Sequence, residues 1–243
     1  MREMAPIERF LVTPLLMFCF LCLQSCDWNT SQVEKDFTRA VRVLNRLIRE
    51  YDKIPENQKL YGSESLIWKD EDQLKYFYQK YRKEFQSVDD ILLTIVKVDN
   101  RNEWYDDAIF LRGNLYWLWT RVVREKQLVK KAIDVLNDYV VLPSEYHLEE
   151  RTKTALQDTF WNKYKDLFSP DLTREENVRV LFRSSIAYLF VTIGEYQMAI
   201  KEYELIVKTY PTSRLSQQAE NQVKGIKDIL EGKRTIPSIS PQK

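Results

Sequence analysis

The sequence predicts an all-helical protein, and three observations lead to that prediction. Its 243 residues include only 5 glycines and 8 prolines, too few for the many tight turns of a β-sandwich, a barrel or a doubly wound sheet. Apolar residues recur at helical spacing along most of the chain. No segment shows a convincing alternation of apolar and polar residues, which is the pattern of a half-buried strand. We therefore expect an all-α fold.

The charge balance and the composition narrow the range of functions. The chain has 37 basic and 36 acidic residues, a formal net charge of +1. Nucleic-acid binding is driven by clustered positive charge on the protein, so this balance argues against a nucleic-acid partner. One histidine and three cysteines leave few residues for metal binding or nucleophilic catalysis. We therefore expect a protein that is not an enzyme.

The N-terminal segment has the pattern of an export signal. An almost unbroken apolar run extends from Phe10 to Leu23, shorter than the roughly 20 residues that span a bilayer as a helix but typical of a signal-peptide core. It ends in Leu23-Gln24-Ser25-Cys26, which resembles the lipobox of bacterial lipoproteins. That resemblance implies cleavage before Cys26 and attachment of lipid to its side chain. An uncleaved signal anchor, or a signal peptide with a chance cysteine, remains the alternative.

The lipobox resemblance divides the start of the chain into two parts. Residues 1–25 are then a lipoprotein signal peptide, and residues 26–31 form a lipidated tether. Cys19 and Cys22 leave with the signal peptide, so the mature chain has no disulfide. The resemblance implies attachment to the bacterial cell envelope, facing the periplasm, with the outer membrane favoured over the inner. Asp27 resembles an inner-membrane retention signal of some bacteria, so the choice of membrane stays open.

Helical periodicity places the helices along the chain. The first helix starts with the capping-box pair Ser31 and Glu34. It carries an apolar stripe from Phe37 to Tyr51 and ends within residues 52–55. After a loop that reaches residue 72, further helices are expected at residues 73–86, 88–98, 104–124, 127–141, 148–167, 174–193, 196–210 and 214–231.

The last complete helix pair, at residues 174–210, is the most regular. Gly194 marks the turn between its helices, because glycine tolerates the left-handed conformation at a helix C-terminus. Ala187 and Ala199 are small residues on the two facing surfaces, which lets the helix axes approach closely. Pro211 ends the second helix. This segment therefore predicts a tightly packed helix hairpin.

This hairpin resembles the tetratricopeptide repeat, a pattern of about 34 residues. The matching residues are Ile186-Ala187, Phe190, Gly194, Tyr196, Ala199, Tyr203, Ile206 and Pro211. Arg183 departs from the pattern, because it stands at the first, tryptophan-like position. The resemblance implies that residues 32–231 form a right-handed superhelical stack of helix hairpins, a TPR-like α-solenoid stabilised by contacts between neighbouring hairpins. Residues 232–243, with their prolines and serines, are expected to be a flexible tail.

The search for catalytic chemistry finds little. His147 has no second histidine to act with it, so we interpret it as a surface residue near a helix start. Four pairs of adjacent acidic residues fall near predicted helix starts, where they complement the helix dipole. These pairs are Asp89-Asp90, Asp106-Asp107, Glu149-Glu150 and Glu175-Glu176. The sequence has no phosphate-binding loop, nucleophile elbow or zinc-ligand spacing, so we predict no cofactor and no metal site.

Aromatic residues crowd one predicted hairpin and suggest a binding surface. Trp117 and Trp119 are two positions apart, so they point to different faces of the helix. We expect one of them in the core and the other either packed on the adjacent hairpin or exposed. Exposed aromatic side chains beside arginine are typical of binding hot spots, although these rings can equally fill the core. From the aromatic cluster, the candidate partner-binding residues are Arg112, Trp117 and Trp119. The repeat resemblance adds Asn114, Arg183 and Tyr188.

These features together indicate a non-enzymatic, lipid-anchored scaffold that binds another protein of the bacterial cell envelope, through an extended or helical segment of that partner. The segment after the last hairpin, Tyr210-Pro211-Thr212-Ser213, is similar in style to the repeat lipoproteins of outer-membrane β-barrel assembly and of the Tol–Pal system. A subunit of the β-barrel assembly machinery is therefore one alternative. A polysaccharide-binding protein or enzyme of the envelope is a second, and repeats that only stabilise a larger complex are a third.

Overall fold

The computed structural model describes residues 32–54, 71–98, 103–123, 125–143 and 146–233. Every regular element within these ranges is a helix, which confirms the predicted fold class. No helix in this part of the chain is long and apolar enough to cross a membrane. The predicted signal peptide, the lipidation site Cys26, the tether and nearly all of the C-terminal tail lie outside the described residues.

The long helices follow one another along the chain. The first covers residues 32–52 and is called here the N-terminal helix. The others are α2 (Glu71–Val98), α3 (Tyr105–Val122), α4 (Lys126–Val140), α7 (Arg174–Thr192), α8 (Tyr196–Thr209) and α9 (Arg214–Leu230). Between α4 and α7 lie four short pieces: α5 (Glu150–Ala155), the π-helical turn η2 (Gln157–Trp161), α6 (Asn162–Tyr164) and the 3-10 turn η3 (Lys165–Leu167).

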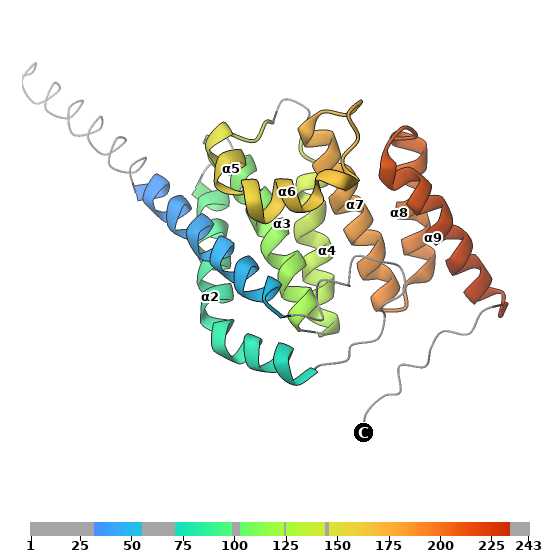
Figure 1. The fold of residues 1–243 in the computed structure, drawn as a ribbon, viewed down its shortest axis with the longest axis horizontal. Coiled ribbons are helices and arrows are strands. Elements are labelled where there is room, and N and C mark those ends of the chain that lie inside the picture. Colours follow the sequence, from blue (N-terminus) through green and yellow to red (C-terminus); the bar gives the residue numbers. More distant parts are fainter. Residues whose placement is uncertain (1–31, 55–70, 99–102, 124, 144–145, 234–243) are drawn as a thin grey trace, which may run out of the picture.

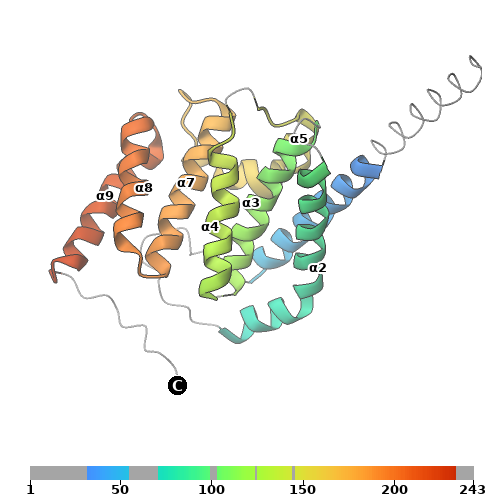
Figure 2. The same cartoon turned by 180° about the vertical axis from the view of Figure 1, so that it is seen from behind.

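The long helices from α2 to α9 stand side by side in a row that follows the chain order (Figure 1). Each packs on its neighbour in the row, α4 next to α7 included. The N-terminal helix, in blue, and the short pieces α5 to η3, in yellow, lie together across one face of this row. Seen from behind, the same row is in front and covers part of these segments (Figure 2). The molecule is therefore a row of helices with a second layer on one side.

Local signals in the sequence set the ends of the last three helices. Thr173 and Glu176 form the complete capping box at the start of α7, each side chain accepting the other residue's backbone N–H. Gly194, between α7 and α8, has a φ of +80°, the left-handed conformation expected for a residue after a helix end. Ser213 caps α9 through its side chain, which accepts the backbone N–H of Ser216. These boundaries lie within a residue of those predicted.

Two predicted helix assignments differ from the structure. Residues 73–86 and 88–98 belong to one continuous helix, α2, because Phe85, Val88 and Leu92 extend a single buried stripe across Ser87. The segment predicted as one helix at 148–167 is instead broken into α5, η2, α6 and η3. The π-helical turn, in which Trp161 N–H donates to the carbonyl of Leu156, places both side chains in the core.

One glycine on α3 makes room for an aromatic ring of α7. A Cβ atom at Gly113 of α3 would lie 2.5 Å from the ring of Phe182 of α7, closer than any real contact. Phe182 also stacks on Phe110 of α3, with ring centroids 5.9 Å apart. Helices that are not adjacent in the chain are therefore joined by direct ring and backbone contact in the centre of the molecule.

Candidate functional site

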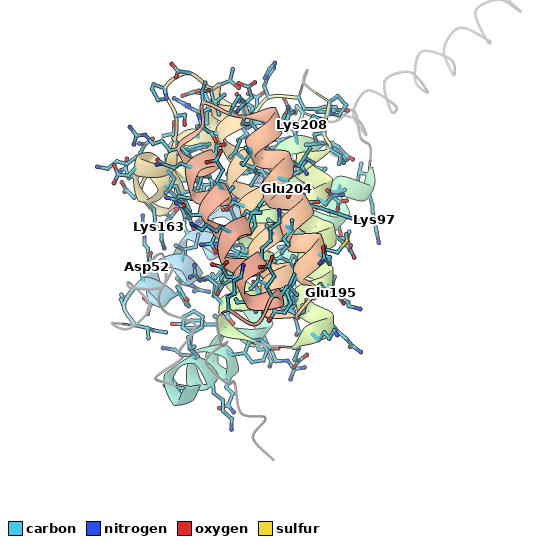
Figure 3. The ribbon with its side chains drawn as sticks, turned by 90° about the vertical axis from the view of Figure 1, so that its right-hand side faces the viewer. Asp52, Lys97, Lys163, Glu195, Glu204 and Lys208 are labelled. Carbon is cyan, nitrogen blue, oxygen red and sulfur yellow. The ribbon has the colours of Figure 1, made fainter. Side chains whose placement is uncertain are left out.

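The segment from α5 to η3 binds to the N-terminal helix through polar groups. We call residues 150–167 the strap, and the surface of the N-terminal helix, α3 and α7 beneath it the strap face. The Asn45 side-chain amide donates to the carbonyl of Ala155 at 2.7 Å and accepts the Thr159 hydroxyl. Lys163 of the strap forms an ion pair with Asp52, and Figure 3 shows these two side chains next to each other. The strap is therefore fixed to residues more than a hundred positions away.

Aromatic rings hold the strap against α3. Phe160 packs edge-on against Phe110 of α3, with centroids 5.0 Å apart, and Trp161 stacks on the same ring at 6.0 Å. Both strap rings are buried. The strap is thus part of the core, and only the portion of the strap face beyond α6 is left for a partner.

A small cavity of about 20 Å³ lies at the edge of the strap, between the N-terminal helix, α3, η2 and α6. This volume suits roughly one water molecule or one small polar group. Its lining combines aromatic, amide and cationic side chains. The lining residues are Ile48, Tyr51, Asn114, Trp117, Leu118, Arg121, Thr159, Lys163 and Tyr164. Two of the six sequence-predicted binding residues, one asparagine and one tryptophan, therefore lie here.

Cationic and polar groups share the lining of the cavity. Arg121 and Lys163 bring two positive charges to it, and Lys163 forms an ion pair with Asp52. Burial raises the pKa of Tyr51, while the nearby Arg121 guanidinium partly offsets that rise, so its hydroxyl stays protonated. The Asn114 amide donates to the Phe110 carbonyl of its own helix at 2.9 Å. The cavity therefore offers a positively charged, polar end next to aromatic walls.

The two tryptophans of α3 have different surroundings. Trp119 is only 9% exposed and packs against Phe85 of α2, with ring centroids 5.2 Å apart. Trp117 is partly buried and meets Tyr188 of α7 edge to face at 5.9 Å, with the Arg121 guanidinium 5.0 Å from its ring. We call Trp117, Arg121 and Tyr188 the aromatic patch. One tryptophan thus lies in the core, and the other packs on the helix of the next pair.

Arg112 is not available on the surface, which corrects the expectation of an exposed arginine beside the aromatic cluster. It is 6% exposed, and its Nε donates to Asp89 Oδ1 at 2.9 Å. Tyr116 donates its hydroxyl to Asp89 Oδ2 at 2.7 Å, and Lys131 reaches the same oxygen at 3.3 Å. Because Asp89 is also buried, its negative charge must be compensated by the partners in this network. It joins α2, α3 and α4 instead of facing a ligand.

Arg183 lies apart from the cavity and the aromatic patch. Its guanidinium pairs with Glu202 of α8 at 2.7 Å, and only 17% of its side chain is exposed. It therefore joins α7 to α8. The structure thus brings Asn114, Trp117 and Tyr188 to one region and leaves Arg112, Trp119 and Arg183 outside it.

A buried carboxyl group lies where α3 begins. Asp107 is fully buried, and its Oδ1 accepts the backbone N–H of Glu149 at 3.2 Å. Burial raises the pKa of Asp107 to about 7, and the adjacent Asp106 carboxylate adds to this rise, while Thr152 and Arg151 lower it. The sequence correctly predicted an acidic pair in the first turn of α3, but its burial follows from packing against residues 149–152.

The arrangement of potential metal ligands can be followed only in the described part of the chain. Within it, no group of three His, Cys, Asp or Glu side chains is placed to hold a metal ion. His147 is exposed just before α5, as expected for a surface residue. Arg121 and Lys163 are the cavity residues that matter most beyond the predicted set. No local pattern marks Lys163, because the strap alone brings it to α3.

Comparisons with known proteins leave the family open. No family model matches the chain, and no curated protein or solved structure is similar enough to count as a match.

Proposed function

We propose that this chain is a non-enzymatic, lipid-anchored helical scaffold that binds another protein of the bacterial cell envelope, facing the periplasm. The lipid anchor is at Cys26, as the lipobox-like sequence suggests. The helix row is proposed to be a TPR-like right-handed stack. The packing of consecutive helices in chain order and the close fit of α7 to α8 support this arrangement, in which a concave face presents side chains to a partner.

One observation carries the proposal of protein binding. The strap face already holds a helical segment, the strap, through buried rings of that segment and an asparagine on the N-terminal helix. The same face continues past the strap into the cavity and the aromatic patch, where Trp117 and Tyr188 keep part of their surface open to solvent. A partner segment that brings an aromatic or aliphatic side chain fits this continuation.

The test is site-specific crosslinking in living cells. A photoactivatable amino acid at Tyr188 is expected to give one defined protein adduct. The same amino acid at Tyr76, which is 67% exposed on α2, is the matched control and is expected to give none. Combining Trp117→Ala with the crosslinker at Tyr188 should reduce the adduct at least tenfold, because it removes the patch's largest ring.

Circular dichroism of each variant shows whether it remains folded. Adducts of equal intensity at positions 188 and 76 would contradict the assignment of this face. If the adduct forms and depletion of the chain also lowers the levels of outer-membrane β-barrel proteins, the partner belongs to β-barrel assembly; unchanged levels reject that alternative. Binding of a glycan that Trp117→Ala abolishes would instead support the polysaccharide-binding alternative.

A further inference from the structure

The exposed side of the N-terminal helix carries a continuous line of positive charge. Its members are Lys35, Arg39, Arg42, Arg46 and Arg49, all exposed to solvent, and we call them the basic stripe. Their spacing alternates between four and three residues, so at 3.6 residues per turn they project within an arc of about 80° over a length of about 21 Å. A helix needs only its opposite side to pack on the core, so core packing does not require these charges.

Among the described residues, the carboxylates near this helix form few ion pairs with the stripe. Asp52 is engaged with Lys163 and Glu50 with Lys53, both past the end of the stripe. Across the interface with α2, Glu84 lies 3.5 Å from Arg46, and within the described residues this is the one ion pair between the stripe and a neighbouring helix. The stripe is therefore a strongly positive strip on a chain whose overall charge is close to zero.

The position of the stripe in the chain indicates what binds it. Lys35 follows the lipidation site Cys26 by nine residues, and nine residues of chain reach at most about 30 Å. A lipid on Cys26 therefore keeps Lys35, where the stripe begins, within about 30 Å of the bilayer surface, and leaves the rest of the stripe free to lie along that surface. Polybasic segments next to a lipid anchor are attracted to anionic headgroups, and an acyl chain combined with such a segment gives firmer attachment than either alone.

We propose that the basic stripe binds anionic phospholipid headgroups and lays the N-terminal helix along the membrane surface. This proposal rests on the membrane attachment contained in the proposed function. The stripe then acts as a second membrane contact that fixes the orientation of the molecule. The row of helices extends from this contact toward α9, which is its far end (Figure 1), so the aromatic patch is held at a constant distance from the bilayer.

Vesicle binding tests the proposal without depending on lipidation. Full-length chain with Cys26→Ser is mixed with phosphatidylcholine vesicles, with and without about 30% phosphatidylglycerol, and the lipid concentration for half-maximal sedimentation is measured on each. Because the apolar run before Cys26 is present in every sample, the ratio of the two concentrations reports the anionic preference alone. Arg39→Gln, Arg42→Gln and Arg49→Gln together should lower this preference on the order of 100-fold, at about fivefold per charge.

A matched control carries the same charge change at the other end of the row. Lys201, Lys208 and Lys224 are exposed on α8 and α9, and their triple change to glutamine should leave the preference unaltered. Equal preference in the two triple variants, or no preference in the unaltered chain, would overturn the proposal. So would a photo-crosslinker at Arg42 that joins an acidic protein in cells and no lipid. Incorporation of labelled palmitate at Cys26 tests the anchor separately, so the two ideas can fail independently.

Discussion

Two regions of the molecule are stabilised by different kinds of contact. The strapped part comprises the N-terminal helix, the strap and the helices from α2 to α7, and the C-terminal end comprises α8 and α9. Around the strap, bonds join residues far apart in the sequence, as Asn45 does with Ala155. The α8 and α9 helices instead pack on chain neighbours, and a typical polar contact there is the 3.1 Å pair of Lys227 and Glu204. The first residue of α9, Arg214, does reach back to the strap, where its guanidinium donates to the carbonyl of Asp166.

This difference predicts unequal local stability. A helix held only by its neighbour can open without disturbing the rest of a stack. A segment that clamps distant helices cannot detach without exposing the rings that it buries. The strapped part should therefore unfold as one unit, while α8 and α9 open at lower free energy. Three predictions test this comparison, beginning with the largest effect.

Removing the centre of the buried network should destabilise the strapped part most. Asp89→Ala removes the carboxylate that pairs with the buried Arg112 guanidinium, which typically lowers the free energy of unfolding by about 3–5 kcal/mol. Urea unfolding monitored by tryptophan fluorescence measures this loss. Asp90→Ala, at the exposed neighbouring position, should change it by less than about 0.5 kcal/mol. Similar losses in both variants would show that the network does not hold α2, α3 and α4 together.

The buried carboxyl of Asp107 should make the strapped part sensitive to pH. Its pKa is about 7 in the folded chain against a usual 3.8, so the folded state binds the extra proton between these values. The contribution of the protonated Asp107 carboxyl to the free energy of unfolding is therefore complete below about pH 4, and it is lost as the pH rises to about 7. From pH 5 to pH 8 we expect the free energy of unfolding to fall by about 2–3 kcal/mol from this group.

Asp107→Asn should flatten this pH dependence, because the amide is neutral throughout. Asp171→Asn, at an exposed position after the strap, should keep the slope of the unaltered chain. Urea unfolding of all three chains at pH 5 and pH 8 makes the comparison. An equally steep decline in the Asp107→Asn chain would assign the effect to other groups.

The smallest effect should be confined to the C-terminal end. Ser213→Ala removes the side-chain cap of α9 and should lower the stability of that helix by about 1 kcal/mol. Hydrogen exchange should speed up in α9 and leave the amides of α3 unchanged. Thr212→Ala, at the exposed preceding position, is the control. Faster exchange throughout the molecule would show that the two regions unfold together.

The same contrast explains how much of the fold could be predicted. The boundaries of α7, α8 and α9 follow from Thr173, Gly194 and Pro211, which act within a turn of their own position and so can be read from sequence. The break in the strap could not be predicted, because the π-helical turn depends on Trp161 reaching the core beside Phe160. Its stabilising partners lie far away in the chain.

Only part of the candidate site could be predicted from the sequence, for the same reason. The sequence correctly separated Trp117 from Trp119 by their helical phase. It interpreted Asp89 as a charge near a helix start, yet this residue is inside α2 and binds Arg112. A buried ion pair has no sequence signature when its partners lie on different helices, so Arg112 was placed on the surface. Whether the aromatic patch binds a partner stays a prediction.

The strap also sets an order of events in time. Asn45 and Thr159 are separated by 114 positions, so this bond cannot form until the strap has been synthesised. The N-terminal helix can pack on α2 early, through contacts such as the ring pair of Tyr51 and Phe77. The strap can pack on this helix only later. Contacts between residues so far apart in the sequence slow folding. Until the strap packs, its aromatic partners are exposed, and such exposed apolar surface promotes aggregation. If the chain is exported, it therefore has a natural interval, before the strap docks, in which it remains open enough to be carried across a membrane.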